Sequence, residues 1–154
     1  MIEFFFDCSS PWTYLAFHNI QPLAKEFGEE ISWRPSVFPV NSVKAMRGCI
    51  WSGKDLVPFA RAVFEAYWGE DKDISKDEVL SEICRRVGID PQKFLLGIAE
   101  QAIKDQLKAN TDEVIARGGF GSPTIFIDKS DMYFGNDRLP LIREALKRQK
   151  ASAA

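Results

Sequence analysis

The chain alternates between short apolar runs and longer segments whose apolar residues recur at helical spacing. The run IEFFF at the amino end predicts a strand over 2–6. The pattern that follows predicts a helix over 11–27 and a second strand over 30–34. Near the carboxyl end we expect two further strands, the first entered through Pro123, and a final helix over 138–149.

The middle of the chain has a helical pattern, because apolar residues recur there every three or four positions. They are Leu56, Phe59, Ala60, Val63, Phe64 and Tyr67 in one stretch, and Val79, Leu80, Ile83, Cys84 and Val87 in the next. Ser75 and Glu78 have the spacing of a capping box for the second of these helices. Asp90-Pro91 predicts the start of a short helix, and 100–117 is expected to be one long helix ending at two glycines.

The order of these elements predicts the fold class. A strand-helix-strand unit is followed by helices, then by two strands and a terminal helix. This is the order of an α/β, thioredoxin-like fold with an all-helical insertion over about 40–117, between the N-terminal βαβ unit and the C-terminal ββα unit. With 154 residues, 45% of them apolar, we expect a single domain over 1–154 with a sizeable core.

Composition and charge argue against several classes of protein. The net charge is −2 with both signs interspersed, which gives no basis for binding nucleic acid or a membrane surface. No stretch approaches the roughly 20 apolar residues of a membrane span, and the amino end has no basic leader, so we expect a cytoplasmic protein. Three cysteines without paired spacing and a single histidine, His18, predict neither a disulfide framework nor a metal site.

Candidate chemistry lies where the first strand gives way to the first helix, at Ser10-Pro11-Trp12-Thr13. Disulfide enzymes place cysteines at the first and last positions of such a stretch. A serine cannot exchange disulfides, but its hydroxyl can donate a hydrogen bond to a thiolate bound from outside, which the helix start also favours. These features indicate a bound thiol such as glutathione. The alternative is that Ser9 or Ser10 only caps the helix, with Pro11 as its first residue.

A second candidate feature lies near the other end of the chain, where residues 118–127 read GGFGSPTIFI. In thioredoxin-like folds the proline entering this strand, here Pro123, is cis. The backbone of the preceding residue, Ser122, then lies against the active-site helix and can pair with an extended peptide. Glutathione is such a peptide, so both ends of the chain favour the same ligand. The alternative is an ordinary trans proline that ends a loop.

Three blocks of residues carry a resemblance to a known family. They are EFFFDCSSPWTYLA at 3–16; FPVNS at 38–42 with ARAVF at 60–64, AYW at 66–68 and DIS at 73–75; and GFGSPTIF at 119–126 with YFGNDRL at 133–139. Together they resemble the 2-hydroxychromene-2-carboxylate isomerases and kappa-class glutathione transferases of the DsbA-like thioredoxin superfamily. The resemblance implies a glutathione-dependent isomerase acting on an aromatic conjugated carboxylate, or a closely related glutathione transferase, with glutathione as its cofactor.

The resemblance also implies roles for individual residues. Ser10 holds the glutathione thiolate as the catalytic group, and Ser122 and Pro123 pair with the cysteinyl backbone. Asn136 and Asp137 receive the γ-glutamyl ammonium, the alternative for these two being a turn and helix cap. An aromatic, apolar pocket with a cation would suit the small aromatic substrate, although an aromatic on a helix face is more often core. The substrate candidates are Trp12, Arg34, Asn41 and Tyr67, followed by Phe38, Lys44, Arg47, Trp51 and Trp68.

One departure from the family pattern bears on function. In the relatives, several tens of residues separate the segments that match WRP at 33–35 and FPVN at 38–41, and a loop asparagine among them helps to bind glutathione. Here Ser36 and Val37 alone join the two segments. One wall of the site is then missing. Either a partner subunit, as in a homodimer, or a rearranged helix fills the gap, or affinity and activity are reduced.

Two other functions follow from particular residues. Cys8 precedes the Ser-Pro pair by two residues, so one alternative is a DsbA-like thiol-disulfide oxidoreductase that uses Cys8. Against this, a strand-end cysteine is more often a small buried hydrophobe, and no resolving cysteine lies at helical spacing. The shortened insertion favours the other alternative, a non-catalytic glutathione-binding protein. A fold resemblance by itself does not choose among these functions.

Overall fold

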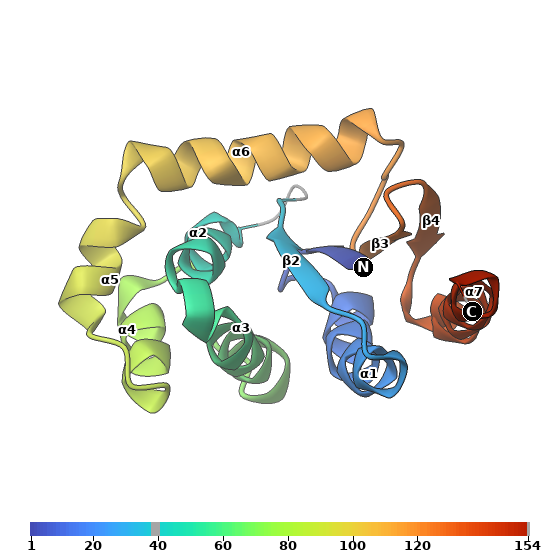
Figure 1. The fold of residues 1–154 in the computed structure, drawn as a ribbon. Helices are drawn as coiled ribbons and strands as arrows, with labels where there is room; N and C mark the ends of the chain where they lie inside the picture. The colour runs from blue at the N-terminus through green and yellow to red at the C-terminus, as the bar shows by residue number, and fades with distance from the viewer. Residues whose placement is uncertain (38–40, 154) are drawn as a thin grey trace.

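The computed structural model describes residues 1–37 and 41–153, in which a four-stranded sheet lies between helices (Figure 1). The elements are β1 (Ile2–Phe6), α1 (Pro11–Phe27), β2 (Ile31–Pro35), α2 (Val43–Trp51), η1 (Gly53–Asp55), α3 (Leu56–Phe64), η2 (Glu65–Gly69), α4 (Asp77–Arg86), α5 (Pro91–Gly97), α6 (Gln101–Ala116), β3 (Thr124–Ile127), β4 (Asp131–Phe134), η3 (Asn136–Arg138) and α7 (Leu139–Ala153). Along this described part of the chain, no helix combines the length and apolar character needed to cross a membrane.

The sheet has the strand order β2-β1-β3-β4. Strand β1 runs parallel to β2, with Phe6 opposite Pro35, and antiparallel to β3, with Phe5 opposite Thr124. All five residues of β1 are buried, the four apolar ones as expected for a central strand and Glu3 as a charged exception. Helices α2 to α6 lie between β2 and β3 in the chain. The predicted α/β, thioredoxin-like fold with a helical insertion is therefore confirmed.

Most predicted element boundaries agree with the structure to within one residue. Strand β2 spans Ile31–Pro35 instead of 30–34, and α7 begins at Leu139 and continues to Ala153, beyond the expected end at 149. Helix α1 is closed by Gly28, whose backbone lies in the left-handed region with a φ of 63°. Glycine adopts that conformation without steric cost. Helix ends are therefore predicted well where a proline or a glycine marks them, as Pro11 and Gly28 do for α1.

The predicted capping box for α4 is wrong. The helix begins at Asp77 with Lys76 as its N-cap, and no side chain caps it. The Ser75 hydroxyl instead donates to the Asp73 carboxylate at 2.6 Å, and the Ser75 amide donates to the same oxygen at 3.0 Å. Asp73 forms a local turn with the residue two positions on, a competing use of the serine that the spacing to Glu78 does not reveal.

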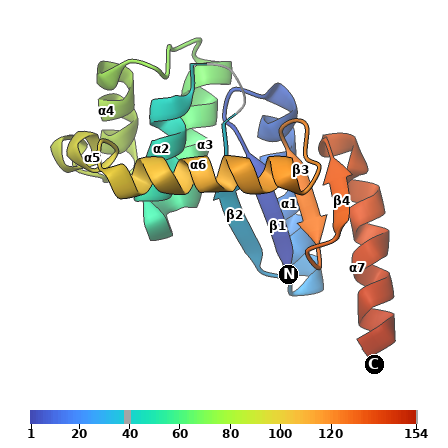
Figure 2. The ribbon, with the colours of Figure 1, turned by 90° about the horizontal axis from the view of Figure 1, so that it is seen from above.

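The two faces of the sheet are covered by different helices. Figure 1 shows α6 above the sheet and α1 and α7 below it, and Figure 2 shows α6 running across the strands. On the α1 face, Phe6 of β1 packs with Phe17 of α1 and Phe64 of α3. The ring of Phe17 lies 4.8 Å from that of Trp33 and 5.2 Å from that of Phe64, measured between centroids. This face holds the main aromatic core.

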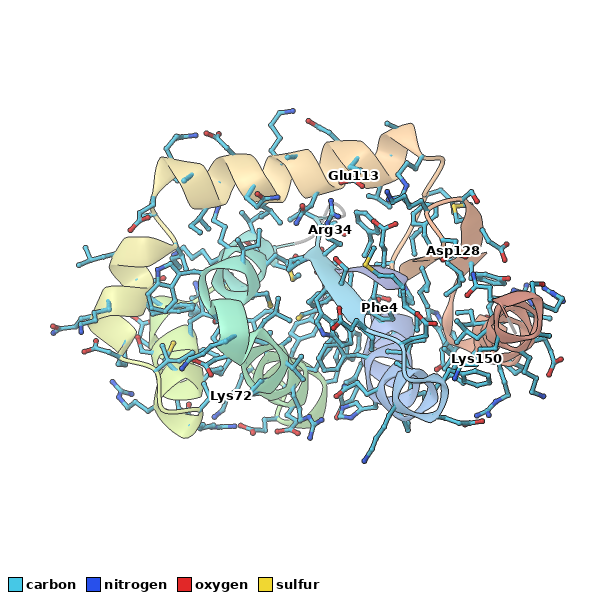
Figure 3. All side chains as sticks on the ribbon, in the orientation of Figure 1. Phe4, Arg34, Lys72, Glu113, Asp128 and Lys150 are labelled. Atoms are coloured by element: carbon cyan, nitrogen blue, oxygen red, sulfur yellow. The ribbon has the colours of Figure 1, made fainter. Side chains whose placement is uncertain are left out.

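The opposite face of β1 meets α6 through charged side chains beside a small buried cluster of Phe5, Phe126 and Val114. Glu3, only 6% exposed, accepts hydrogen bonds from the Arg117 guanidinium at 2.9 and 3.1 Å, and a nitrogen of Arg34 lies 3.5 Å from it. Arg34 also pairs with Glu113 of α6, toward which it points in Figure 3. The hydrogen bonds from Arg117 hold the pKa of Glu3 below its ordinary value, although burial acts in the opposite direction.

Candidate active site at the start of the first helix

Ser10 is the N-cap of α1. Its backbone is extended, with φ −99° and ψ 122°, and its hydroxyl oxygen accepts the Thr13 amide at 3.2 Å. The capping role weighed from the sequence is therefore real. Pro11 has no amide hydrogen and the Thr13 amide is used by the cap, so helix geometry leaves the Trp12 amide pointing out of the first turn. The dipole of the 17-residue helix adds positive potential at this point.

The helix start meets the loop that precedes β3. The Ser10 hydroxyl donates to the carbonyl oxygen of Ser122 at 2.8 Å, across 112 residues of sequence. The hydroxyls of Thr13 and Ser122 hydrogen-bond each other at 2.6 Å. The Ser122–Pro123 peptide bond is cis, as expected for a thioredoxin-like fold. The helix start at Ser10 and the loop at Ser122 and Pro123, far apart in the sequence, thus form one polar cluster.

A buried carboxylate lies behind this cluster. Asp7 is fully buried, and its amide donates to the Ser122 hydroxyl at 2.8 Å. One of its carboxylate oxygens accepts both the amide and the hydroxyl of Ser9 at 2.9 Å, and the other accepts the Ser42 hydroxyl at 2.9 Å. Asp7 is not among the residues to which the sequence motifs give a role. The spacing Asp-x-Ser, typical of a turn in which aspartate binds the backbone two residues on, is the signal that identifies it.

Aromatic residues of η2 lie beside the loop that leads into α1. The Trp68 indole donates to the Cys8 carbonyl oxygen at 3.2 Å, and its ring packs edge-on against Tyr67 at 4.9 Å between centroids. Trp12, in the first turn of α1, is 62% exposed. Trp51 instead packs against Phe94 inside the insertion, and Phe38 lies outside the described residues. Among the aromatic candidates that the structure describes, Trp68 hydrogen-bonds directly to the loop.

The candidate cations differ in what they already bind. Arg34 is on the α6 face of the sheet, held by two carboxylates, so the structure does not bring it to the helix start as a substrate ligand. Lys44 pairs with Asp77 at 2.8 Å. Arg47 makes no ion pair within 1–37 and 41–153, and its buried Nε has no hydrogen-bond partner there. Asn41 is exposed.

The loop after β4 is anchored to the cis proline. The amide of Gly135 donates to the Pro123 carbonyl oxygen at 3.2 Å. The Asn136 side chain accepts a hydrogen bond at 3.0 Å from Asn19. Asn19 is nine residues beyond Ser10, which corresponds to about 14 Å along the axis of α1. Asp137 is exposed and pairs with its neighbour in η3, Arg138, at 3.4 Å. Asn136 and Asp137 are the two predicted ligands of the ammonium group. The carboxylate of Asp137 is exposed, whereas Asn136 is half-buried.

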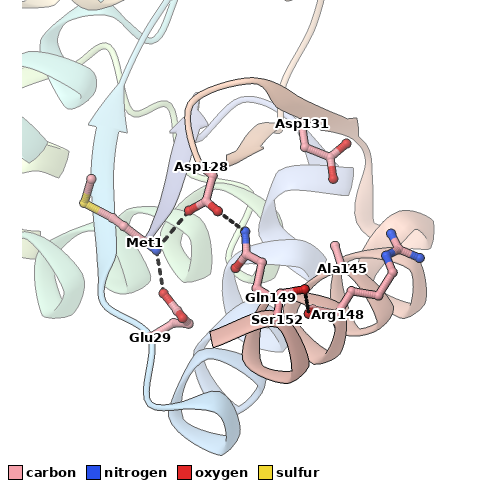
Figure 4. A pocket seen from close by; sticks show the side chains of 8 residues that line it. All are labelled: Met1, Glu29, Asp128, Asp131, Ala145, Arg148, Gln149 and Ser152. Carbon is pink, nitrogen blue, oxygen red and sulfur yellow. Dashed lines mark hydrogen bonds and ion pairs between the residues drawn. The ribbon is translucent and has the colours of Figure 1, made fainter. Parts of the chain in front are cut away.

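A surface hollow lies at the other end of β1 (Figure 4). Its lining includes Glu29 and Asp128, and the amino group of Met1 lies 2.6 Å from the first and 3.8 Å from the second. Met1 precedes β1 and Asp7 follows it, so about 20 Å separate the hollow from the helix start at the rise of a strand. Its carboxylates are partly neutralised by the chain's own amine, and it shares no residue with the Ser10 cluster.

Comparison with known proteins agrees with the fold. A family model described as a DSBA-like thioredoxin domain matches residues 17–147, most of the chain. The chain belongs to this DSBA-like family. It is 24% identical to the 2-hydroxychromene-2-carboxylate isomerase of Pseudomonas putida in an alignment of 193 residues that covers 96% of this chain and 95% of that protein. It is 29% identical to glutathione S-transferase kappa 2 of Caenorhabditis elegans over 93 residues, 56% of this chain and 41% of that protein.

Solved structures resemble this DSBA-like chain along nearly its whole length. A 2-hydroxychromene-2-carboxylate isomerase structure has a TM-score of 0.85 at 23% identity, covering 99% of this chain and 98% of its own. The DsbA of Pseudomonas aeruginosa has a TM-score of 0.79 at 22% identity, covering 99% and 85%. These likenesses show the fold. The predicted membership of the DsbA-like superfamily, with distant kinship to the isomerases and kappa-class transferases, is confirmed.

Proposed function

We propose that this protein is a glutathione-dependent isomerase of an aromatic conjugated carboxylate, or a closely related glutathione transferase. The observation that carries the proposal is the 2.8 Å hydrogen bond from Ser10 to the carbonyl oxygen of Ser122. It joins a helix start that favours an anion to a backbone segment that can pair with a peptide. Glutathione needs both features, since it is a peptide that carries a thiol. The distant kinship to the isomerases supports the same activity.

The residues at the helix start fit this ligand through an exchange of hydrogen bonds. In this structure, the Ser10 hydroxyl donates a hydrogen bond to the carbonyl oxygen of Ser122. We infer that this carbonyl accepts the cysteinyl amide of the bound peptide, which releases the Ser10 hydroxyl to donate to the thiolate. One internal hydrogen bond is then replaced by two to the ligand, and a hydrogen bond to an anion is the stronger kind. The amide of Trp12 and the helix dipole favour the same charge.

Bound glutathione would supply the thiolate nucleophile that adds to the conjugated substrate and leaves again after rotation about the bond made single. The chain's part is to keep that sulfur ionised at neutral pH through Ser10 and Trp12. Around it, Trp12, Tyr67 and Trp68 offer an aromatic wall. Arg47, whose Nε has no partner among the described residues, is the cation we favour for the substrate carboxylate. The exposed carboxylate of Asp137 suits the γ-glutamyl ammonium.

The test separates peptide binding from thiolate binding. Wild type and Ser10→Ala are titrated calorimetrically with glutathione and with S-methylglutathione, and the pKa of the bound glutathione thiol is followed by thiolate absorbance. We expect Ser10→Ala to raise that thiol pKa, because a donor to the thiolate is lost. Its affinity for S-methylglutathione should be retained, because the Ser122 carbonyl is then free to pair with the peptide. Turnover of a hydroxychromene carboxylate should fall with the fraction of thiolate.

A matched control accounts for the lost helix cap. Ser10→Ala also removes an N-cap, which typically costs about 1 kcal/mol of stability. Asp90→Ala removes the N-cap of α5, where the carboxylate accepts two amides, and Asp90 belongs to none of the groups in the proposed site. This control should leave the thiol pKa unchanged. If the thiol pKa is the same in wild type and Ser10→Ala, Ser10 is not part of the mechanism, and if wild type binds neither ligand the proposal fails.

A further inference from the structure

Two buried thiols meet directly behind the candidate site. Cys8 lies in the loop between β1 and α1, and Cys49 lies in α2. Both are free and fully buried in the same core cluster, and the neighbouring Cys49 thiol raises the pKa of the Cys8 thiol. The sequence places no second cysteine at helical spacing from Cys8, so this partner comes only from the fold. The contact joins the loop that carries the helix start to the helical insertion.

A third sulfur holds Cys8 against the same helix. The amide of Cys8 donates to the thioether sulfur of Met46 at 3.3 Å. Met46 and Cys49 are three residues apart on α2, so their side chains share one face of that helix. The amide of Cys8 is therefore held against the face of α2 that also carries Cys49. A geometry held in this way favours a reaction between the two thiols over a reaction with any other cysteine.

We propose that Cys8 and Cys49 form a dithiol site that low-molecular-weight disulfides oxidise to an intramolecular disulfide behind the helix start. The site does not depend on glutathione binding, and its test uses an oxidant without a peptide. The thiolate of one cysteine attacks a sulfur of the small disulfide, which forms a mixed disulfide and expels one thiolate. The second cysteine attacks the mixed disulfide and expels the other thiolate. The chain loses two electrons and two protons, and the small disulfide becomes two thiols.

The surroundings of the pair make this reaction slow. Burial raises the pKa of the Cys8 thiol well above its ordinary value, and the contact with Cys49 acts in the same direction. Exchange therefore proceeds when the loop before α1 opens far enough to admit the oxidant. The same cover protects the disulfide once it has formed. Cys84 of α4 is the matched buried thiol without such a partner, and burial raises its pKa to about 12.

Three tryptic peptides report on the three cysteines, because each contains one of them. Residues 1–25 contain Cys8, 48–54 contain Cys49 and 77–85 contain Cys84. The full chain is incubated overnight with bis(2-hydroxyethyl) disulfide in native buffer, with circular dichroism showing that it stays folded, then alkylated and digested. We expect wild type to lose two of its three thiols and to yield 1–25 linked to 48–54.

Variants test which thiols are needed. Cys84→Ala should give the same linked peptides as wild type. Cys49→Ala should lose the intramolecular product and at most carry one mercaptoethanol group on Cys8, and alanine is chosen because a buried free cysteine packs as a small hydrophobe. The proposal is overturned if folded wild type keeps all three thiols, if the linked peptides include 77–85, or if a non-reducing gel shows that the disulfide joins two chains.

Discussion

The two faces of β1 hold their helices in different ways. On the α1 face, Phe6 packs into a cluster of aromatic rings with Phe17 and Phe64. On the α6 face, Glu3 meets the guanidinium of Arg117 in a charged contact. Apolar packing is non-directional and tolerates small shifts, whereas a bidentate ion pair fixes orientation. The α1 face therefore holds the larger aromatic cluster, whereas on the α6 face a smaller apolar cluster is joined by an ion pair that orients the insertion's last helix across the sheet.

The largest effect expected from this comparison is at Phe17, whose ring contacts those of Phe6, Trp33 and Phe64. Phe17→Ala should lower the free energy of unfolding by about 3–5 kcal/mol, measured by urea denaturation, because a large buried ring is lost. Phe120→Ala is the control, because the Phe120 side chain is 70% exposed. Its loss should change stability by no more than about 0.5 kcal/mol. Equal losses in the two variants would contradict the division between the faces.

The next effect is on the charged face. Arg117→Met removes the bidentate partner of the buried Glu3 carboxylate and leaves Arg34, at 3.5 Å, as its remaining ion pair among the described residues. This change should cost about 2–3 kcal/mol in the same denaturation experiment. The double variant Glu3→Met/Arg117→Met should lose less than the sum of the two single changes, because no carboxylate is then left without its bidentate partner. Additive losses would show that the two side chains stabilise the fold independently.

A smaller effect appears as a dependence on pH. The pKa of Glu3 is lowered from its ordinary value of 4.5 by its hydrogen bonds with Arg117. The pair therefore stabilises the fold above that pH and ceases to do so as the pH falls through the lower, folded-state pKa. The difference in unfolding free energy between wild type and Glu3→Gln should be present at neutral pH and shrink in acid. A difference that is the same at every pH would contradict the assigned cause.

The smallest effect is expected from an ion pair in solvent. Lys108 and Asp112 pair on α6 with side chains 74% and 60% exposed. Lys108→Ala should cost no more than about 0.5 kcal/mol, and less in high salt, because exposed pairs are screened by water and ions. A cost as large as that of Arg117→Met would mean that burial does not distinguish the two kinds of pair.

Much of the fold follows from local sequence signals. The largely apolar run in β1, the Ser-Pro start of α1 and the Asp90-Pro91 start of α5 each predicted an element that the structure contains. Local reasoning failed at Ser75, where a nearer aspartate took the hydroxyl expected to cap α4. The ion pairs of Arg34 with Glu3 and Glu113 were likewise not evident from the sequence, because they join residues distant along the chain.

The candidate site residues also divide into those that local motifs predict and those that only the fold brings together. Ser10 and Ser122 were predicted because each stands in a motif with recognisable backbone behaviour, a helix N-cap and a residue before proline. Asp7 has a local signal in its spacing to Ser9, but its contact with the Ser42 hydroxyl has no signature in a single sequence. The contact between Cys8 and Cys49 was beyond prediction for the same reason, as it joins a loop to a distant helix.

The sequence by itself determined where several of the helices and strands begin and end, because periodicity, caps and prolines act through neighbouring residues. It also determined the family, through motifs that keep their order along the chain. Only the tertiary structure decided which side chains meet: Ser10 with Ser122, Cys8 with Cys49, and Glu3 with Arg117. Those contacts depend on how the sheet and its two helical layers pack, and packing free energy is a property of the whole chain.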